Sequence, residues 1–130
     1  MNFRAPTGLA LGTLLLALTP GCASSAPKAP QLTREWLLGY WVPKGVDCES
    51  DGGVAYEAAG TWEAYGAAGR WRLVGHRLVT TVDEKWDDDE PPKKLTAPEQ
   101  HTALVRPKAA NIFSAVWEDG TVRELRRCPK

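Results

Sequence analysis

The segment VAYEAAGTWEAYGAAGRWRLVGHRLVTTV, residues 54–82, decides the fold of this chain. Glycine-containing turns divide it into short runs in which apolar and polar residues alternate, which is typical of strands with one buried face. Ala58-Ala59-Gly60 predicts a three-residue hairpin loop, and Gly75-His76 carries the glycine that a type II′ turn needs at its first position. The segment therefore predicts four consecutive antiparallel strands joined by tight turns.

Pairing across these turns tests whether neighbouring strands agree on which face is buried. The first loop sets Tyr56 opposite Trp62, so two aromatic residues share one face. A turn at Ala67-Ala68 would set Glu63 opposite Arg72, an opposite-charge pair on the other face. The predicted inner face of the four strands comprises Val54, Tyr56, Trp62, Ala64, Trp71, Leu73, Leu78, Thr80 and Val82.

The C-terminal part of the chain predicts one more hairpin. Asp119-Gly120 is typical of a type I′ turn, which would pair Phe113 with Arg126. Alternation is less regular here because this register places Arg126 on the aromatic face, and a bulge near residues 123–124 would turn Leu125 inward.

Three further segments complete the predicted order of elements. A helical turn is expected over Thr33–Leu38, where the Thr33 hydroxyl can cap the first turn, and a first strand is expected over Leu37–Val42. Another strand is expected near Gln100–Arg106, preceded by an acidic, proline-rich loop over Asp87–Pro98.

The chain is therefore predicted to be all-β, a small antiparallel up-and-down meander of about eight short strands preceded by one short helical turn. Such a meander either packs as an open sandwich or closes into a barrel, and we favour the barrel because closure removes exposed strand edges. Hydrophobic residues make up 43% and charged residues 25% of the sequence, which fits one folded domain over residues 32–130. The formal net charge of 0 supplies no basic excess for binding nucleic acid.

The N-terminus predicts export from the cytoplasm. Arg4 precedes an apolar run over residues 8–18, which is shorter than the roughly 17–25 residues that a membrane-spanning helix needs. A positive start, a short apolar run and then small residues are typical of a cleaved signal peptide, here residues 1–21.

The sequence Leu18-Thr19-Pro20-Gly21-Cys22 resembles the lipobox of bacterial lipoproteins. The resemblance implies that Cys22 is lipidated and becomes the mature N-terminus, so that a flexible tether over residues 22–31 anchors the domain to a membrane of the cell envelope. Ala23 after the cysteine implies the outer membrane, with the domain facing the periplasm. Ordinary cleavage after Ala26 is the alternative.

Three cysteines are an odd number for an exported protein, in which unpaired thiols are a liability. If Cys22 is lipidated, Cys48 and Cys128 remain and predict one disulfide in an oxidising compartment. Two free thiols or a pair of metal ligands are the alternatives, and no CxxC spacing favours metal.

Gly39-Tyr40-Trp41, directly after the expected helical turn, matches the Gly-x-Trp that opens the first strand of lipocalins. The chain thus resembles a shortened lipocalin-type barrel. Lipocalins place an arginine of the last strand over that tryptophan, and the resemblance implies this role for Arg126, with Arg127 as the alternative.

Tryptophan is the strongest compositional signal for a binding site, with six residues at positions 36, 41, 62, 71, 86 and 117. They favour either an aromatic ligand cavity or simple packing. We expect packing, because an eight-stranded barrel is just wide enough for its own side chains. Trp36 and Trp86 fall outside the inner-face pattern and are the candidate contact residues on the surface.

The remaining polar candidates predict no catalytic or metal site. Asp87–Glu90 lacks the alternating ligands of a calcium-binding loop and is expected to be a solvated loop tip. His76 and His101 lack zinc-type spacing to other ligands, and Ser50 and Ser114 lie in no nucleophile-elbow motif. We therefore expect a protein without cofactor or enzymatic activity.

The functional hypothesis is a lipid-anchored binding or interaction module of the cell envelope, whose partner is another envelope protein or a small apolar ligand. The alternative is a periplasmic inhibitor of a hydrolase of the protease or lysozyme type. An inhibitor predicts a protruding loop, and residues 87–98 are the one long candidate.

Overall fold

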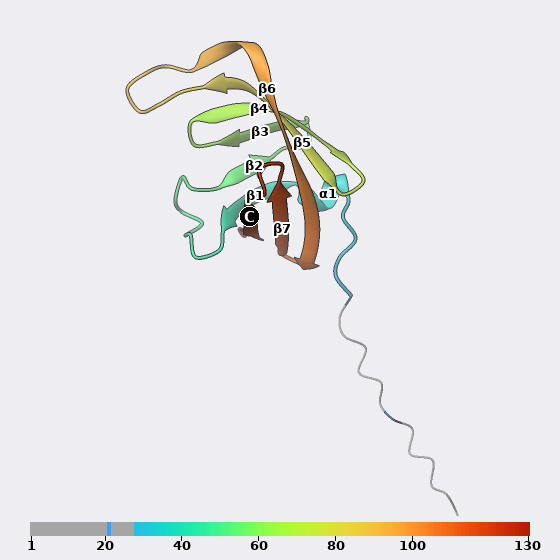
Figure 1. Ribbon diagram of the computed structural model, residues 1–130. Helices are drawn as coiled ribbons and strands as arrows, with labels where there is room; N and C mark the ends of the chain where they lie inside the picture. The colour runs from blue at the N-terminus through green and yellow to red at the C-terminus, as the bar shows by residue number, and fades with distance from the viewer. Residues whose placement is uncertain (1–20, 22–27) are drawn as a thin grey trace, which may run out of the picture.

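The computed structural model describes Gly21 and residues 28–130, so the predicted signal peptide and the lipidation site at Cys22 lie outside the described residues. One short helix, α1 (Arg34–Leu37), precedes the strands (Figure 1). The strands are β1 (Gly39–Pro43), β2 (Val54–Tyr56), β3 (Thr61–Ala64), β4 (Ala67–Val74), β5 (Arg77–Lys85), β6 (Lys93–Ala109), β7 (Ile112–Trp117) and β8 (Val122–Arg127).

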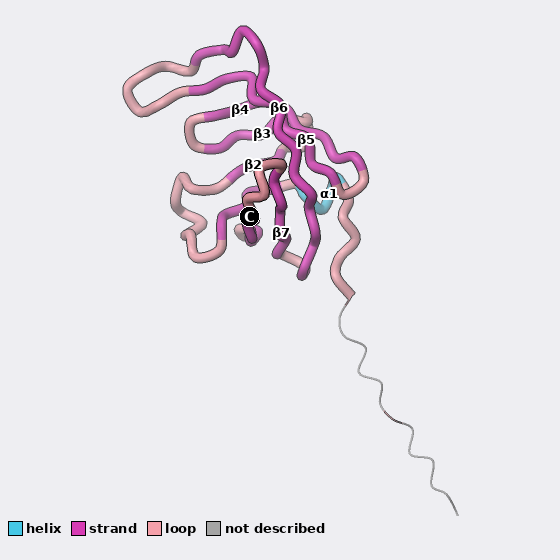
Figure 2. The backbone as a smooth tube through the Cα atoms, viewed as in Figure 1, coloured by secondary structure: helices cyan, strands magenta, loops and turns pink. Residues whose placement is uncertain are grey.

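The strands form one closed antiparallel barrel in which each strand pairs with its neighbours in the sequence (Figure 2). The barrel closes between β1 and β8, where Trp41 lies opposite Arg127 and Pro43 lies opposite Leu125. Closure gives every strand a partner on both sides over part of its length, which reduces the aggregation hazard of a small sheet, while residues 93–101 of β6 have no pairing with β7. The predicted all-β barrel with a short helix in front is confirmed, and the sandwich alternative is excluded.

The inner face predicted for β2 to β5 is also confirmed. Tyr56 lies opposite Trp62 across β2 and β3, and Leu73 lies opposite Leu78 across β4 and β5. Gly75 has a φ of 60°, which an L-residue rarely adopts, so this turn needs its glycine.

The turn between β3 and β4 differs from the prediction. It lies at Tyr65-Gly66 rather than at Ala67-Ala68, and Gly66 supplies a φ of 81°. Glu63 consequently lies opposite Ala68 instead of Arg72. The register moves by an even number of residues, so every side chain stays on the face of the sheet that was predicted for it. Glu63, however, no longer has the arginine that was predicted opposite it.

The hairpin between β7 and β8 also differs, here by one residue. Phe113 lies opposite Leu125 instead of Arg126, because the loop has three residues and ends at Gly120, whose φ is 85°. A type I′ turn would also require a positive φ at Asp119, and no described residue other than glycine has one. A shift of one residue turns each β8 side chain to the other face, so Leu125 faces the interior as predicted, but without the bulge expected near residues 123–124.

β5 and β6 form a long hairpin that projects past the neighbouring strands (Figure 1). The loop expected over residues 87–98 is therefore shorter than predicted, since β6 begins at Lys93, which pairs with Lys85. The pairing is interrupted over residues 95–98, which include Pro98, and again at Lys108, directly after Pro107. Proline has no N–H to donate to a ladder, so Pro98 and Pro107 lie at irregular positions of a long strand.

The predicted disulfide between Cys48 and Cys128 is present, with a Cα–Cα distance of 5.7 Å. Cys48 belongs to the loop over residues 44–53, which folds back along the outside of the barrel. Arg126 on β8 donates a hydrogen bond to the carbonyl oxygen of Val46 in this loop at 2.8 Å. The bridge therefore ties the first long connection to the end of the last strand.

α1 covers one end of the barrel. Thr33 caps it, since its hydroxyl accepts a hydrogen bond from the backbone N–H of Trp36 at 3.1 Å. Leu37 is fully buried, and its carbonyl oxygen accepts a hydrogen bond from the Trp41 indole N–H at 2.8 Å. Across the described part of the chain, no helix has the length and apolar character needed to cross a bilayer. This closed end lies opposite the β1–β2, β3–β4, β5–β6 and β7–β8 connections.

Candidate functional site

The barrel interior contains a cavity of about 560 Å³. It opens between the β1–β2 and β7–β8 connections, because Gly52 and Gly53 of the first and Glu118 and Asp119 of the second line its mouth. The apolar lining consists of Pro43, Val54, Tyr56, Trp62, Ala64, Leu78, Val82, Phe113, Ala115, Trp117 and Leu125. Trp41, Trp71 and Phe113 are packed in the core as expected, but the aromatic side chains do not fill the whole interior.

The aromatic residues leave this space open because five of them gather at the closed end. Trp36 and Trp41 lie with ring centroids 5.2 Å apart, and Phe113 lies 4.7 Å from Trp41. Tyr56 and Trp71 form a second pair at 5.5 Å. Of these rings, Tyr56 and Phe113 line the cavity, and Trp36 is packed against the buried core instead of standing on an open surface.

Arg127, rather than the predicted Arg126, lies over Trp41. Its guanidinium carbon is 4.2 Å from the Trp41 ring centroid and 5.4 Å from that of Trp36. Arg127 also donates hydrogen bonds to the backbone oxygens of Leu38 and Trp36. The one-residue shift of β8 explains the correction, because it turns Arg127 inward and Arg126 outward. Burial lowers the pKa of the Arg127 guanidinium, which nevertheless remains a cation at neutral pH.

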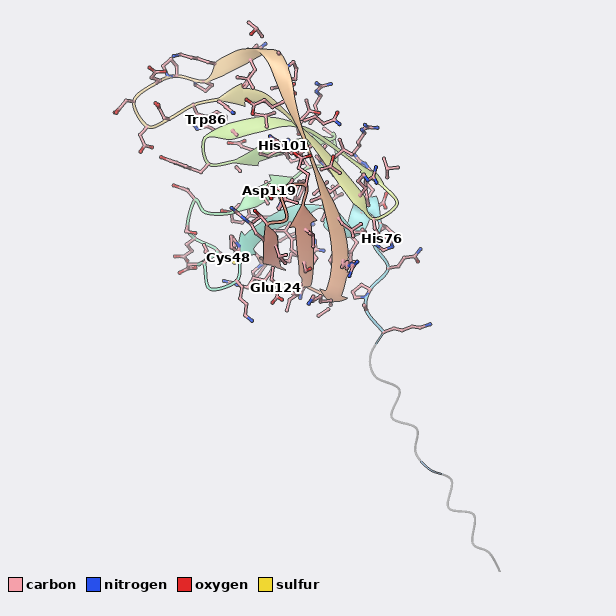
Figure 3. All side chains as sticks on the ribbon, in the orientation of Figure 1. Cys48, His76, Trp86, His101, Asp119 and Glu124 are labelled. Atoms are coloured by element: carbon pink, nitrogen blue, oxygen red, sulfur yellow. A yellow bond between two sulfur atoms is a disulfide. The ribbon has the colours of Figure 1, made fainter. Side chains whose placement is uncertain are left out.

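Polar side chains surround the mouth of the cavity. His101 Nδ1 lies 3.0 Å from a carboxylate oxygen of Glu118, which joins β6 to the β7–β8 loop. The backbone N–H of Thr121 donates to Asp119 at 2.8 Å, and this hydrogen bond holds the pKa of Asp119 below its usual range. Arg123 also lines the mouth. Figure 3 shows His101 and Asp119 close together on this side.

The floor of the cavity holds one polar group of a different kind. Burial raises the pKa of the Tyr56 phenol well above its usual range, so this hydroxyl is neutral at any physiological pH. A neutral phenol among apolar walls can accommodate the uncharged part of a ligand, whereas the polar residues at the mouth can bind a polar or charged group of the same ligand.

Trp86, the second candidate contact residue, lies away from the cavity, in a shallow groove on the outside of the barrel. Its backbone N–H donates to the carbonyl oxygen of Gly66 at 3.0 Å, which ties the β5–β6 connection to the β3–β4 turn. His76 lies at the opposite end, where its Nδ1 is 3.2 Å from the carbonyl oxygen of Val105 (Figure 3).

The other polar candidates are accounted for by local structure. Ser114 is buried in β7, and the Ser50 hydroxyl donates to the backbone oxygen of Asp47 at 2.6 Å. Residues 87–90 are exposed at the tip of the β5–β6 hairpin, and Lys93 forms an ion pair with Glu90 there. Over Gly21 and residues 28–130, no group of three His, Cys, Asp or Glu side chains is placed to hold a metal ion.

Comparisons of the chain with protein-family models, with curated protein sequences and with solved structures found no match in any of the three. The cavity and the groove beside Trp86 are the two features of the barrel that point to a function.

Sequence reasoning missed the residues that distinguish these two sites. Arg123 was not singled out, because the predicted two-residue turn placed it on the outer face. The signal was available, since Glu118-Asp119-Gly120 forms the same kind of loop as Ala58-Ala59-Gly60, with glycine last in both. Tyr65 and Glu63 in the groove carried no signal, because their neighbours there come from distant segments.

Proposed function

We propose that this chain is a lipid-anchored protein of the cell envelope and that its barrel is a non-catalytic binding module for a small, largely apolar molecule. The cavity carries this proposal. Its volume of about 560 Å³ lies within the roughly 300–1,000 Å³ that is usual for ligand pockets. Its walls are mainly aliphatic and aromatic, and its charged side chains are gathered at one opening.

The position of the N-terminal segment supports an anchored orientation. The described chain enters the barrel beside α1, on the side away from the β5–β6 hairpin (Figure 1). A lipid on Cys22 would hold the closed end toward the membrane, so that the mouth faces the periplasm. Replacement of Cys22 by serine should therefore release the protein from the membrane fraction, and a variant that still sediments with membranes would contradict the anchor.

Ligand binding is tested with N-phenyl-1-naphthylamine, an uncharged apolar dye that fluoresces when it leaves water. We expect saturable binding by the mature protein. Ala115→Phe and Val54→Phe place a ring in the cavity and should each weaken binding about tenfold or more, because the space that the dye needs is filled.

The control is Ala97→Phe, which adds the same ring at an exposed position of β6 outside the cavity. Urea titration shows which variants are folded, and only folded variants are compared. The proposal fails if the wild-type protein does not bind the dye, or if the cavity variants and the control bind it equally well.

Inhibition of a hydrolase is the second candidate function, and the projecting β5–β6 hairpin is the observation that favours it (Figure 1). A two-residue turn in place of residues 86–92 would remove the tip and leave the barrel strands intact. Assay of the wild-type protein against periplasmic proteases and lysozymes, followed by assay of the shortened variant, tests this role. Inhibition that survives the shortening would contradict it.

A further inference from the structure

A groove of about 300 Å³ runs along the outside of the barrel, separate from the cavity floor. Three aromatic side chains from different segments form its walls, and small residues form its base. The walls are Tyr40 of β1, Tyr65 of the β3–β4 turn and Trp86 after β5. Gly53, Ala55 and Ala64 at the base leave room between the rings.

Hydrogen bonds to the backbone hold the walls in place. The Tyr40 hydroxyl donates to the carbonyl oxygen of Ser50 at 2.7 Å and accepts from the N–H of Gly53 at 3.1 Å. A Cβ on Gly53 would lie 2.5 Å from the Tyr40 ring, so the close approach requires glycine. The Tyr65 hydroxyl donates to Asp88, which connects two of the loops. These hydrogen bonds restrict Tyr40 and Tyr65, which limits the entropy lost when a ligand enters.

The groove also carries negative charge that the protein itself does not neutralise. Asp51 and Glu63 both line it, and neither forms an ion pair with any residue that the structure describes. Glu63 lies between Ala55 and Ala68 on the two neighbouring strands, so no cation stands across from it. Its shifted register thus leaves a carboxylate free beside aromatic rings.

Negative charge extends beyond the groove along this end of the barrel. The β1–β2, β5–β6 and β7–β8 connections, residues 44–53, 86–92 and 118–121, together carry nine carboxylates and one lysine. The whole chain has a formal net charge of 0, so this excess reflects an uneven distribution between the two ends. A surface of this kind steers and retains cationic partners.

We propose that the groove docks a basic segment of a partner protein, with the side chain of one arginine or lysine lying between Tyr65 and Trp86 and its charged group at Asp51 and Glu63. Aromatic faces attract a cation and also cover its aliphatic stem, and the two carboxylates supply the opposite charge. Arginine is favoured over lysine because its planar group both stacks on rings and binds carboxylates.

The chemistry of the surroundings favours a protein over other cationic ligands. A small amine would contact only the groove. The acidic residues are spread over three connections, which only an extended basic surface can contact together. The groove lies on the outer face of the barrel, so this proposal does not depend on occupancy of the cavity.

The test uses the mature exported protein in a non-ionic detergent and a blocked hexapeptide of alternating glycine and arginine. Titration calorimetry at low salt should show binding that weakens as salt is added. The Asp51→Asn/Glu63→Gln double variant should weaken binding about tenfold, since two carboxylates lose their charge without losing shape. Trp86→Leu should weaken it about threefold, because an apolar wall remains without the aromatic face.

The matched control is Glu35→Gln/Glu57→Gln, which removes the same charge from exposed positions outside both the groove and the three acidic connections. It should weaken binding less than about twofold. NMR spectra should show shifts at Ala55, Glu63 and the Trp86 indole, which line the groove and not the cavity, on titration with the peptide.

Four results would overturn the proposal: no peptide binding at low salt, equal loss in the control variant, NMR shifts confined to the cavity lining, or agmatine binding as tightly as the peptide. The last would indicate a small-amine site. None of these results affects dye binding in the cavity, so this proposal and the proposed function fail separately.

Discussion

Replacing Arg127 with alanine should destabilise the barrel more than any other single change at an arginine. This side chain joins three parts of the closed end. It extends from β8, donates hydrogen bonds to the backbone oxygens of Leu38 and Trp36, and covers the ring of Trp41. Alanine removes all of these contacts and opens the floor of the cavity.

The expected loss follows from these contacts. Hydrogen bonds from a charged donor contribute about 1.5–3 kcal/mol each, and a cation over an aromatic ring contributes about 0.5–2 kcal/mol. Arg127 is half-buried, so water partly replaces the lost donors and the lower ends of the ranges apply. We expect a loss of about 3–4 kcal/mol in the free energy of unfolding, which lowers the melting temperature by about 15 °C in a domain of this size.

Urea titration followed by tryptophan fluorescence measures the loss, and Arg126→Ala is the matched control. Arg126 lies on the outer face of β8 and makes one hydrogen bond to Val46 and one weak contact with the Cys48 sulfur, so its loss should cost about 1 kcal/mol. Equal losses in the two variants, or a loss below about 1 kcal/mol for Arg127→Ala, would refute the assignment of the inward position to Arg127.

Three other predictions concern stability. The Cys48→Ser/Cys128→Ser double variant should have a free energy of unfolding about 3–4.5 kcal/mol lower than the wild-type protein, because the bridge spans 80 residues. Reduction of the wild-type protein should lower the free energy of unfolding in urea by the same amount. A folded protein with two titratable thiols before reduction would contradict the bridge. Gly69→Ala should lower the free energy of unfolding by more than about 2 kcal/mol in the same titration, because the added Cβ would lie 1.7 Å from a backbone oxygen of β5. An unchanged urea midpoint would contradict that close approach. The hydrogen bond from Arg70 lowers the pKa of Asp83 in the folded protein. The pair therefore stabilises the protein fully at a pH above the usual carboxyl pKa of about 4. This stabilisation is lost as the pH falls through the lower pKa of the folded state. Asp83→Asn should therefore flatten the decline of the urea midpoint in acid, and an equally steep decline would contradict it.

The predicted hairpins succeeded where a glycine had one position to occupy. Gly60 and Gly75 fixed two registers, because each supplies the positive φ that its loop requires. The β3–β4 turn failed because Gly66 and the two alanines after it offered two turns with the same side-chain parity. Local alternation cannot separate such registers, since both bury the same residues.

The β7–β8 hairpin failed for a different reason. Asp119-Gly120 is compatible with a two-residue or a three-residue loop, and the barrel interior decides between them. The three-residue loop buries Leu125 against the same interior as Phe113, whereas the predicted loop would have buried Arg126. The cost of burying an unpaired cation far exceeds the difference between two turn types.

Three features follow from the sequence alone: the number and order of the strands, the inner face of β2 to β5, and the pairing of Cys48 with Cys128. The strands and their inner face follow from turn glycines and from a period of two residues, and the disulfide follows from the number of cysteines. Only the tertiary structure decided that the barrel is hollow and that Tyr65 and Trp86 share a groove with Glu63. Cavity volume depends on how the strands tilt and where the large rings stack, and the groove unites segments that closure alone brings together. The alternation of residues along a single strand predicts neither the cavity volume nor the groove.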